Sequence, residues 1–437
     1  MVATIIISVI TFVSVIASIL FFPKLKIGKI RLDTYWIIAL IGAVILLAVS
    51  LAPIKEVGEE LISNKAINPL KILVLFFSMT AISIVLDELG LFRYLASVAS
   101  KHTKDKQIRL FIALYFLTAF LTIFTSNDIV ILTLTPFICF FSKRSKINPL
   151  PYLVAEFVAA NTWSLMFIIG NPTNIYLATS AGINFISYFK VMAVPTIVGG
   201  ILELLILLLI FYRKLKEPIM SDPTIEEIKD KPALIVGVSI LVICLVFLII
   251  SSYINLEMWL ISLICALTLL LFMLIYSIFR KENFINLTSS LKRLPYQLIP
   301  FFLSMFVIVV ALNSQGISGE IAKLLGNSHT IWVYGYSSFI ASNLINNIPM
   351  SILFTNIASS LSGNAYLEAI YASIVGSNIG AFLTPIGALA GIMFTSLVNK
   401  NEVKFSFIDF IKYGVIISVP VITSILALTK VFILINI

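Results

Sequence analysis

Charge is scarce in this chain of 437 residues. Asp, Glu, Lys and Arg make up only 12% of it, whereas hydrophobic residues make up 60%, and the mean hydropathy is +1.08. A soluble domain carries about twice that share of charge, so the composition predicts an integral membrane protein with many spans. The net charge of +9 does not indicate a nucleic-acid partner, because the basic residues cluster in short loops between apolar runs. The expected surroundings are a lipid bilayer.

Reactive side chains and catalytic motifs are also scarce. The three cysteines, Cys139, Cys244 and Cys265, lie in apolar runs and lack the spacing of a metal site. The sequence contains no His-Glu-x-x-His motif, no Ser/His arrangement, no paired Asp in facing spans and no phosphate-binding loop. We therefore expect no enzyme and no cofactor, and any drive by ATP would come from a separate subunit.

Apolar runs set the number of spans, since crossing a bilayer takes about 20 apolar residues. Ten segments meet this requirement: 3–22, 34–53, 69–87, 150–181, 190–212, 233–252, 256–279, 296–313, 367–399 and 407–434. Two longer segments, 108–142 and 330–362, carry a polar cluster near the middle, "TSND" and "SNLINN". These two are predicted to be re-entrant hairpins, which turn on their polar residues and return to the same side.

The distribution of basic residues supports this arrangement. Six loops fall on one side of the membrane: 23–33, 88–109, 143–149, 213–232, 280–295 and 400–406. They hold 4, 5, 3, 5, 4 and 2 basic residues, which is 23 of the 30 Lys and Arg in the chain. The positive-inside rule makes this side the cytoplasm. We therefore predict a multi-pass protein of the cytoplasmic membrane with both termini outside.

Three pairs of similar segments indicate an internal repeat. "LDELGLFRYLA" (86–96) parallels "LNSQGISGEIA" (312–322), "ANTWSLMFIIG" (160–170) parallels "SNIGAFLTPIG" (377–387), and "FISYFK" (185–190) parallels "FIDFIK" (407–412). Each copy would contain five crossings and one hairpin, and an odd number of crossings inverts the second copy. The predicted fold is an all-α polytopic membrane protein with inverted repeats at 1–215 and 233–437, joined by a cytoplasmic linker at 216–232.

Polar residues interrupt the apolar runs at four places, two in each repeat. They are the two hairpin tips and two breaks within the spans 150–181 and 367–399. We predict that these places form one midplane site, with helix N-termini for an anion and amide oxygens for a cation. The predicted binding residues are Ser126, Asn127, Asp128, Asn161, Gly170, Asn171, Thr173, Asn174, Asn343, Asn346, Asn347, Asn378, Thr384 and Gly387. The predicted sodium ligands among them are Asn127, Asn174, Asn347 and Asn378.

Asp128 is the only charged residue between Phe116 and Phe141. A carboxylate at membrane depth usually faces a cavity and binds an ion or a proton. Asp is also a good helix cap, so both roles are open for Asp128. Glu156, on the same span as Asn161, is a weaker site candidate, and Glu203 is either a proton carrier or a helix-packing partner.

The polar segments resemble those of a known group. "FTSNDIVILTLTP" (124–136), "NNIP" (346–349) and "GSNIGAFLTPIGALAGIM" (376–393) are similar to motifs of the arsenite/antimonite efflux permeases. Those are ArsB/NhaD-type permeases of the ion transporter superfamily, which also holds sodium/proton antiporters and sodium-coupled dicarboxylate and citrate carriers. Two features depart from the arsenite branch: Asn378 stands where those permeases tend to have an acidic residue, and "GNPTN" (170–174) is closer to the other branches.

The resemblance implies a secondary active transporter of a small ion. Its leading substrate is arsenite or antimonite, moved outward at the expense of the proton gradient or the membrane potential, with Asp128 as the coupling group. A sodium/proton antiporter and a sodium-coupled small-anion carrier remain open, as does an ion channel. The coupling ion would be a proton or sodium, and a homodimer and a separate ATPase subunit are the protein partners that the resemblance allows.

Overall fold

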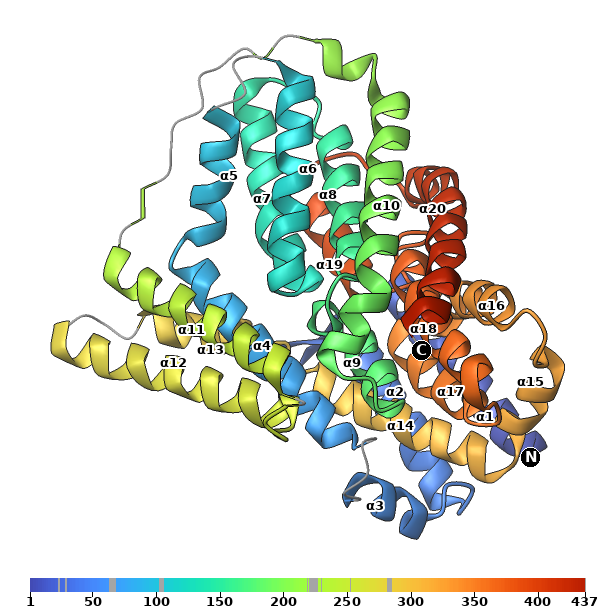
Figure 1. Cartoon of the computed structure of the whole chain (residues 1–437). Helices are drawn as coiled ribbons and strands as arrows, with labels where there is room; N and C mark the ends of the chain where they lie inside the picture. The colour runs from blue at the N-terminus through green and yellow to red at the C-terminus, as the bar shows by residue number, and fades with distance from the viewer. Residues whose placement is uncertain are drawn as a thin grey trace.

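The computed structural model describes residues 1–22, 24–27, 30–62, 68–101, 106–217, 219, 227–228, 230–251, 253–280 and 285–436. Helices dominate this part of the chain (Figure 1). One antiparallel β-hairpin, formed by β1 (Lys24–Ile27) and β2 (Ile30–Asp33), lies between the first two helices. The predicted all-α class is confirmed.

The first half of the chain runs from α1 to α10. Its helices are α1 (Val2–Phe21), α2 (Thr34–Ala48), α3 (Ile54–Ile62), α4 (Pro69–Glu88), α5 (Leu91–Lys101), α6 (Gln107–Phe124), α7 (Asn127–Ser145), α8 (Leu150–Trp163), the short 3₁₀ helix η1 (Ile168–Gly170), α9 (Pro172–Ser180) and α10 (Phe185–Phe211). A second 3₁₀ helix, η2 (Lys214–Lys216), follows α10.

The second half repeats this order. Its helices are α11 (Lys231–Ile250), α12 (Met258–Arg280), α13 (Ile285–Arg293), α14 (Leu298–Ser314), α15 (Ile317–Leu325), α16 (Thr330–Ile345), α17 (Asn347–Ala358), α18 (Gly363–Gly380), α19 (Leu389–Lys400) and α20 (Phe407–Asn436). The hairpins fall where the sequence predicts them, as α6–α7 and α16–α17. The broken helices are also confirmed, as α8–η1–α9 and α18–α19.

Two further observations match the halves to each other. Gly90 after α4 and Gly316 after α14 both adopt a positive φ, 88° and 75°, a conformation that glycine adopts without strain. The helices α10 and α20 lie side by side in opposite directions (Figure 1), since Phe211 stacks near Tyr413 whereas Met192 contacts Thr429. Opposite directions of equivalent helices are expected of an inverted repeat.

Eight helices in the described part of the chain are long and apolar enough to cross a membrane, namely α1, α4, α6, α10, α11, α12, α14 (counted from Leu287) and α20. The sequence prediction has ten crossings because it adds three to these eight and leaves one out. It adds α2, which is only 15 residues long, and the two broken helices, and it leaves out α6 because it treats α6 as an arm of a hairpin. Many of the spans bury less than half of their residues, such as α11 with 33% of its window. Their apolar outer faces suit contact with lipid.

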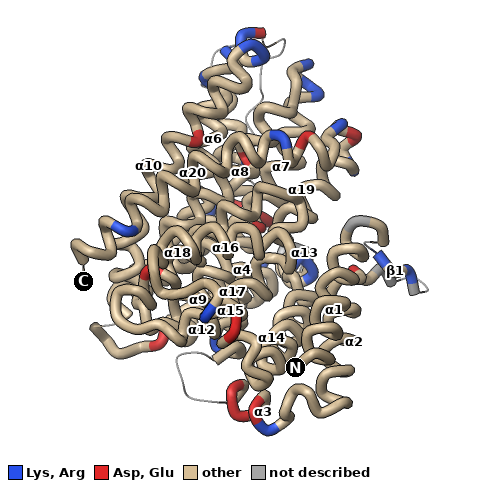
Figure 2. The backbone as a smooth tube through the Cα atoms, turned by 90° about the vertical axis from the view of Figure 1, so that its right-hand side faces the viewer, with Lys and Arg blue, Asp and Glu red and all other residues tan. Residues whose placement is uncertain are grey.

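The side of the molecule that carries the described residues of the six basic loops is called the basic face. Figure 2 places Lys and Arg at the ends of α6 and α10, at α13 and around β1, whereas α3 and α15 lie toward the other end with mixed charges. The contacts among the described residues of these loops include Lys143–Glu402 at 4.0 Å, Arg280–Asp230 at 3.7 Å and Gln107 with the Glu217 carbonyl at 2.9 Å. Arg293 contacts Asp87 at 2.6 Å and Glu88 at 2.5 Å. On the other face the N-terminal amine donates to Gln315.

Four short helices do not appear in the sequence prediction. They are α3, α5, α13 and α15, of nine to eleven residues, which lie between longer helices on the two faces. The predicted linker at 216–232 falls largely outside the described residues, so the division into two domains stays a prediction.

Candidate functional site

The first broken helix is interrupted by a close backbone approach. A methyl group on Gly170 would overlap the carbonyl oxygen of Ser164, so a larger residue does not fit there. Asn171 then caps α9 by accepting from the Thr173 N–H at 3.1 Å, and Pro172 occupies the first position of that helix, where no N–H is needed. The interruption therefore leaves the α9 N-terminus inside the protein.

Asn378 of α18 binds this break from the other repeat. Its Oδ1 accepts from Ser164 Oγ at 2.7 Å and from Asn171 Nδ2 at 3.0 Å. Its Nδ2 donates to Asn174 Oδ1 at 2.6 Å and to the carbonyl of Ile374 at 2.8 Å. All the polar side chains of this cluster are buried, and buried polar groups are stable only when they are hydrogen-bonded in this way. The structure thus brings three of the predicted site residues, Asn171, Asn174 and Asn378, together in one cluster.

The second hairpin tip binds the second break in a separate cluster. Asn343 donates to the Gly380 carbonyl at 2.9 Å and accepts from Thr384 at 2.7 Å. Asn346 donates to the Ile386 carbonyl at 3.0 Å, and the Asn347 N–H donates to the Gly387 carbonyl at 3.0 Å. The helical interruption leaves carbonyl groups without a hydrogen-bond partner within the helix, and these contacts supply one. Backbone groups at membrane depth need such partners.

Asn346 holds this tip in a strained backbone conformation. Its φ of 72° and ψ of 154° lie in a region that is almost restricted to glycine, at a cost of roughly 1–3 kcal/mol for other residues. The Asn346 side chain offsets part of the cost, since it accepts from the Ile348 N–H at 3.3 Å while it binds Ile386. An asparagine here gives the hairpin both its turn and its attachment to the break.

The first hairpin tip is less fully bonded. Asn127 donates to Asn161 Oδ1 at 3.2 Å, which ties the tip to α8. Within the described part of the chain, Asn127 Oδ1 and Ser126 Oγ are buried without a hydrogen-bond partner. Buried oxygens without a donor are costly unless a bound group meets them, so this tip offers open ligand positions that the other clusters lack.

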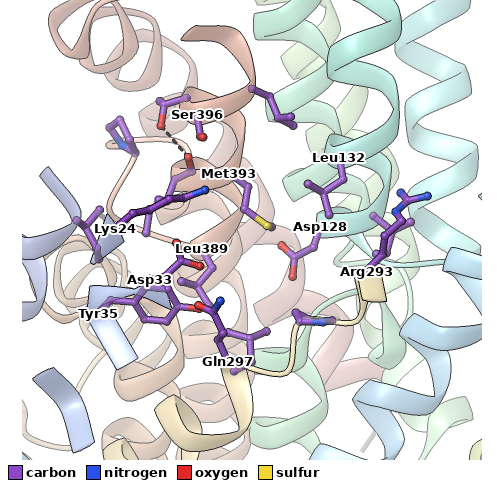
Figure 3. A pocket seen from close by; sticks show the side chains of 18 of the residues that line it. Lys24, Asp33, Tyr35, Asp128, Leu132, Arg293, Gln297, Leu389, Met393 and Ser396 are labelled. Atoms are coloured by element: carbon purple, nitrogen blue, oxygen red, sulfur yellow. Dashed lines mark hydrogen bonds between the residues drawn. The ribbon is translucent and has the colours of Figure 1, made fainter. Parts of the chain in front are cut away.

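A cavity of about 810 Å³ lies against this tip. Figure 3 shows the Asp128 side chain directed into the cavity from α7, opposite Met393 and Leu389 of α19. Pro385 and Ile386 of the second break also line it, so the cavity joins the first hairpin to the second broken helix. Among the described residues, no hydrogen bond or ion pair reaches the Asp128 carboxylate.

Four charged residues other than Asp128 line the cavity, all from segments outside the predicted spans, and we call this part of the lining the mouth of the cavity. Lys24, Asp33, Lys292 and Arg293 line it together with Gln297, and all come from segments on the basic face. Burial raises the pKa of Asp33 above its ordinary value, against the opposing effects of Lys24 and of a hydrogen bond with Gln297. Arg293 is held by two carboxylates at the end of α4, Asp87 and Glu88, which balance its charge.

Two other buried carboxyl groups lie away from this cavity. Glu156 accepts from Thr135 Oγ1 at 2.9 and 3.0 Å and is absent from the cavity lining, so the expectation that it approaches the site is not supported. Glu203 contacts Tyr115 and Thr162 behind the first break. Of Asp128, Glu156 and Glu203, only Asp128 lines the cavity, where Asp33 is the other carboxyl group.

Sequence reasoning missed several residues that complete the site. Ser164 donates to Asn378, Ser377 donates to Thr173 at 2.8 Å, and Thr80 lines the cavity from α4. Ser164 and Ser377 lie within a few positions of predicted site residues in the same apolar runs. Polar residues next to a predicted site residue in an apolar run are therefore the sequence feature that identifies them. Thr80 carries no such signal, because its place depends on the packing of α4 against α7.

Comparisons with known proteins agree with this architecture. The family model described as a citrate transporter, CitMHS, matches residues 30–376. The arsenical pump membrane protein of Escherichia coli (strain K12) is 26% identical over 362 residues, 79% of this chain and 82% of that protein. The putative arsenical pump membrane protein of Bacillus subtilis (strain 168) is 25% identical and covers 87% of this chain and 90% of its own length.

A solved structure has the same fold. The crystal structure of the Alcanivorax borkumensis YdaH transporter aligns with a TM-score of 0.56 over 99% of this chain and 98% of that one, at 11% sequence identity. The alignment extends over both halves of the chain. The family match and the fold together identify a multi-pass membrane transporter.

Proposed function

The chain belongs to the citrate transporter family CitMHS, and from this membership and its site we propose that it is a secondary active transporter of the cytoplasmic membrane. Its proposed substrate is arsenite or antimonite, which it moves out of the cell. The proposed driving force is the proton gradient or the membrane potential, with a proton or sodium as the coupling ion. The relatives named as arsenical pump proteins, over about four fifths of both chains, favour this substrate.

One observation carries the proposal: the carboxyl group of Asp128 lines the cavity at the first hairpin tip, and within the described part of the chain it has no hydrogen-bond or ion-pair partner. The cavity lining also holds amides and hydroxyls, among them those of Gln297, Asn399, Thr80 and Ser396, which suit a small hydroxylated solute. Arsenious acid is such a solute, and it is uncharged at neutral pH. A multiply charged anion would instead meet the carboxylate of Asp128, which forms no ion pair among the described residues.

Asp128 also suits the coupling role. A carboxyl group that lines a cavity at membrane depth alternates between a charged and a neutral form at a cost that depends on water access. In our proposal, Asp128 releases its proton when the cavity opens toward one side and takes it up on the other. The oxygens of Ser126 and Asn127, which lack partners, would hold the solute or a coupling cation beside it.

A second candidate is a sodium-coupled carrier of a small organic anion such as a dicarboxylate or citrate. The description of the family model favours it, as does a cavity of about 810 Å³ with Lys24, Lys292 and Arg293 at its mouth. Helix N-termini at the breaks would supply the positive potential that such an anion needs. In this case Asp128 would serve as a sodium ligand.

Uptake into everted membrane vesicles separates these functions. Vesicles energised by respiration receive arsenite with and without a sodium gradient, while their internal pH is followed. Arsenite accumulation that collapses with the proton gradient supports the first proposal. Sodium-dependent citrate or dicarboxylate flux without arsenite accumulation supports the second, and a pH change on addition of sodium alone would move the protein to the sodium/proton antiporters.

A further inference from the structure

Glu203 lies in the middle of α10 and is fully buried. Its carboxyl group contacts side chains from two other helices behind the first break. Thr162 of α8 donates to Glu203 Oε2, and Tyr115 of α6 lies 3.0 Å from Glu203 Oε1. The carboxyl group therefore joins an arm of the first hairpin to the last turn of α8.

The hydrogens of Tyr115 decide the protonation state of this group. Its hydroxyl oxygen lies 2.6 Å from the Gly200 carbonyl oxygen, and the indole N–H of Trp163 donates to it at 3.1 Å. A phenol has one hydrogen, and a separation of 2.6 Å between two oxygens requires a hydrogen between them. Tyr115 therefore donates to Gly200, and the contact with Glu203 needs a proton from the carboxyl group.

With that proton in place every group in the cluster is satisfied. Glu203 donates through Oε1 and accepts from Thr162 through Oε2, while Tyr115 donates once and accepts twice. If Glu203 were ionised, the contact between its Oε1 and the Tyr115 hydroxyl oxygen would have no hydrogen. The carboxylate would also be a buried charge, which is costly. Of the described residues on α6, α8, α11, α20 and η1, only Tyr115 is a titratable group in contact with the carboxyl, so nothing there balances a charge.

This cluster lies directly behind the ligand-bearing turn of α8. Asn161, which bonds Asn127, directly precedes Thr162. Ser164, which bonds Asn378, comes two positions after Thr162. Trp163 lies against Gly200, where a methyl group would overlap its ring. We infer that the neutral, protonated carboxyl of Glu203 is a positioning device, which fixes the last turn of α8 and thereby the binding amides.

A glutamine at this position tests the inference, because its amide can donate to Tyr115 and accept from Thr162 in the same places. Infrared difference spectra of the purified protein at neutral pH, wild type against Glu203→Gln, report the carbonyl stretch of a protonated carboxyl without any substrate. We expect that band to disappear in the variant. An unchanged spectrum in that region would show that Glu203 is ionised, which overturns the inference.

A transport assay is the second test, and this assay rests on the proposed substrate. In vesicles with equal amounts of folded protein, we expect Glu203→Gln to transport arsenite within about twofold of wild type with the same pH profile, and Glu203→Leu to raise KM by about tenfold or more. Thr162→Val, which removes only the hydroxyl donor, should raise KM in the same direction and leave the infrared band in place.

The remaining outcomes each contradict the inference. A shifted pH profile in Glu203→Gln would make Glu203 a proton carrier, and wild-type KM in both Glu203→Leu and Thr162→Val would remove it from the site's support. If the wild type moves citrate or sodium instead of arsenite, the kinetic comparison is made with that solute. The proposed substrate then fails while the infrared result still decides the state of Glu203.

Discussion

The side-chain amide of Asn378 donates to Asn174 Oδ1 over 2.6 Å, and this bond joins the broken helices of the two repeats. The same amide accepts from Ser164 and Asn171 and donates to a carbonyl of its own helix. One side chain thus bonds four groups, three of which lie at the first break. The site is shared between the repeats, so a change on either side of this bond affects both.

Asn378→Asp should disrupt this joint although it changes only one group. The substitution keeps the oxygen that accepts from Ser164 and Asn171, but it replaces the donor with an oxygen that faces the oxygens of Asn174 and Ile374. Leaving buried groups unsatisfied costs about 1–3 kcal/mol each, and more beside a charge. We expect a lower midpoint of thermal unfolding in detergent and at least a tenfold loss of transport.

Ser377→Ala is the matched control, because it removes a single neighbouring hydrogen bond, the one to Thr173. It should lower the unfolding midpoint by clearly less than Asn378→Asp does. Equal effects of the two substitutions would mean that Asn378 has no special place in the joint.

The hairpins and breaks are visible in the sequence because polar residues stand out in apolar runs that are too long for one span. "TSND" and "SNLINN" mark their turns by composition alone, and Gly170 and Gly387 mark the breaks. The short helices α3, α5, α13 and α15 have amphipathic patterns of only nine to eleven residues, which a span-length criterion counts as loops.

The partners of the charged groups are not visible in the sequence. Arg293 meets Asp87 across 206 positions and Tyr115 meets Glu203 across 88, and such pairs form only when helices from distant parts of the chain pack. The cavity has the same origin, because α2, α4, α7, α14 and α19 all contribute to its lining. The sequence pattern therefore locates the polar residues of the site, whereas the packing of the helices decides which of these residues remain without a partner.

Asp128→Asn should fold normally and lose coupled transport. The amide has the size of the carboxyl and can still begin α7, but it does not exchange a proton or carry charge. We expect arsenite accumulation in energised vesicles to fall to the background of membranes without the protein. Glu156→Gln is the control, since it changes a buried carboxyl outside the cavity, and it should keep coupled transport. Wild-type accumulation in Asp128→Asn would remove Asp128 from the mechanism.

Arg293→Ala should destabilise the mouth of the cavity. Arg293 binds Asp87 at 2.6 Å and Glu88 at 2.5 Å, and only 4% of the Asp87 side chain is exposed. Both carboxylates stand at the C-terminal end of α4, where the helix dipole opposes negative charge. Removing their cation should cost roughly 1–3 kcal/mol, a value reduced for the partial exposure of Arg293.

The unfolding midpoint in detergent measures this cost. Lys323→Ala breaks an exposed pair with Glu320 within α15 and should leave the midpoint unchanged, because such surface pairs contribute little. If Arg293→Ala is as stable as the wild type, the pairs at the end of α4 do not hold the mouth together.

Labelling of single cysteines tests the orientation of the two faces. The native cysteines are all buried, so they give a low background. Lys143→Cys, on the basic face, should react with a membrane-impermeant maleimide only in everted vesicles, and Lys323→Cys should react only from outside intact cells. The reverse pattern would place the basic face outside and contradict both the orientation and the positions of the termini.

Gly170→Ala should damage the first break more than its single added methyl group suggests. That methyl would overlap the Ser164 carbonyl oxygen, which also accepts from Asn174 Nδ2 at 2.9 Å. Backbone on both sides leaves little room to relax, so overpacking here should cost about 1–3 kcal/mol. The displaced carbonyl should also loosen the bond between Asn174 and Asn378 and reduce transport.

Gly319→Ala provides the comparison, because a methyl group there meets no atom within 4 Å. Gly319 lies inside α15, and alanine is a better helix former than glycine by about 1 kcal/mol. The unfolding midpoint should therefore rise or stay level in Gly319→Ala and fall in Gly170→Ala, with transport lost only in the latter. If the two variants behave alike, glycine at position 170 reflects helix propensity, and the close approach to Ser164 does not control the break.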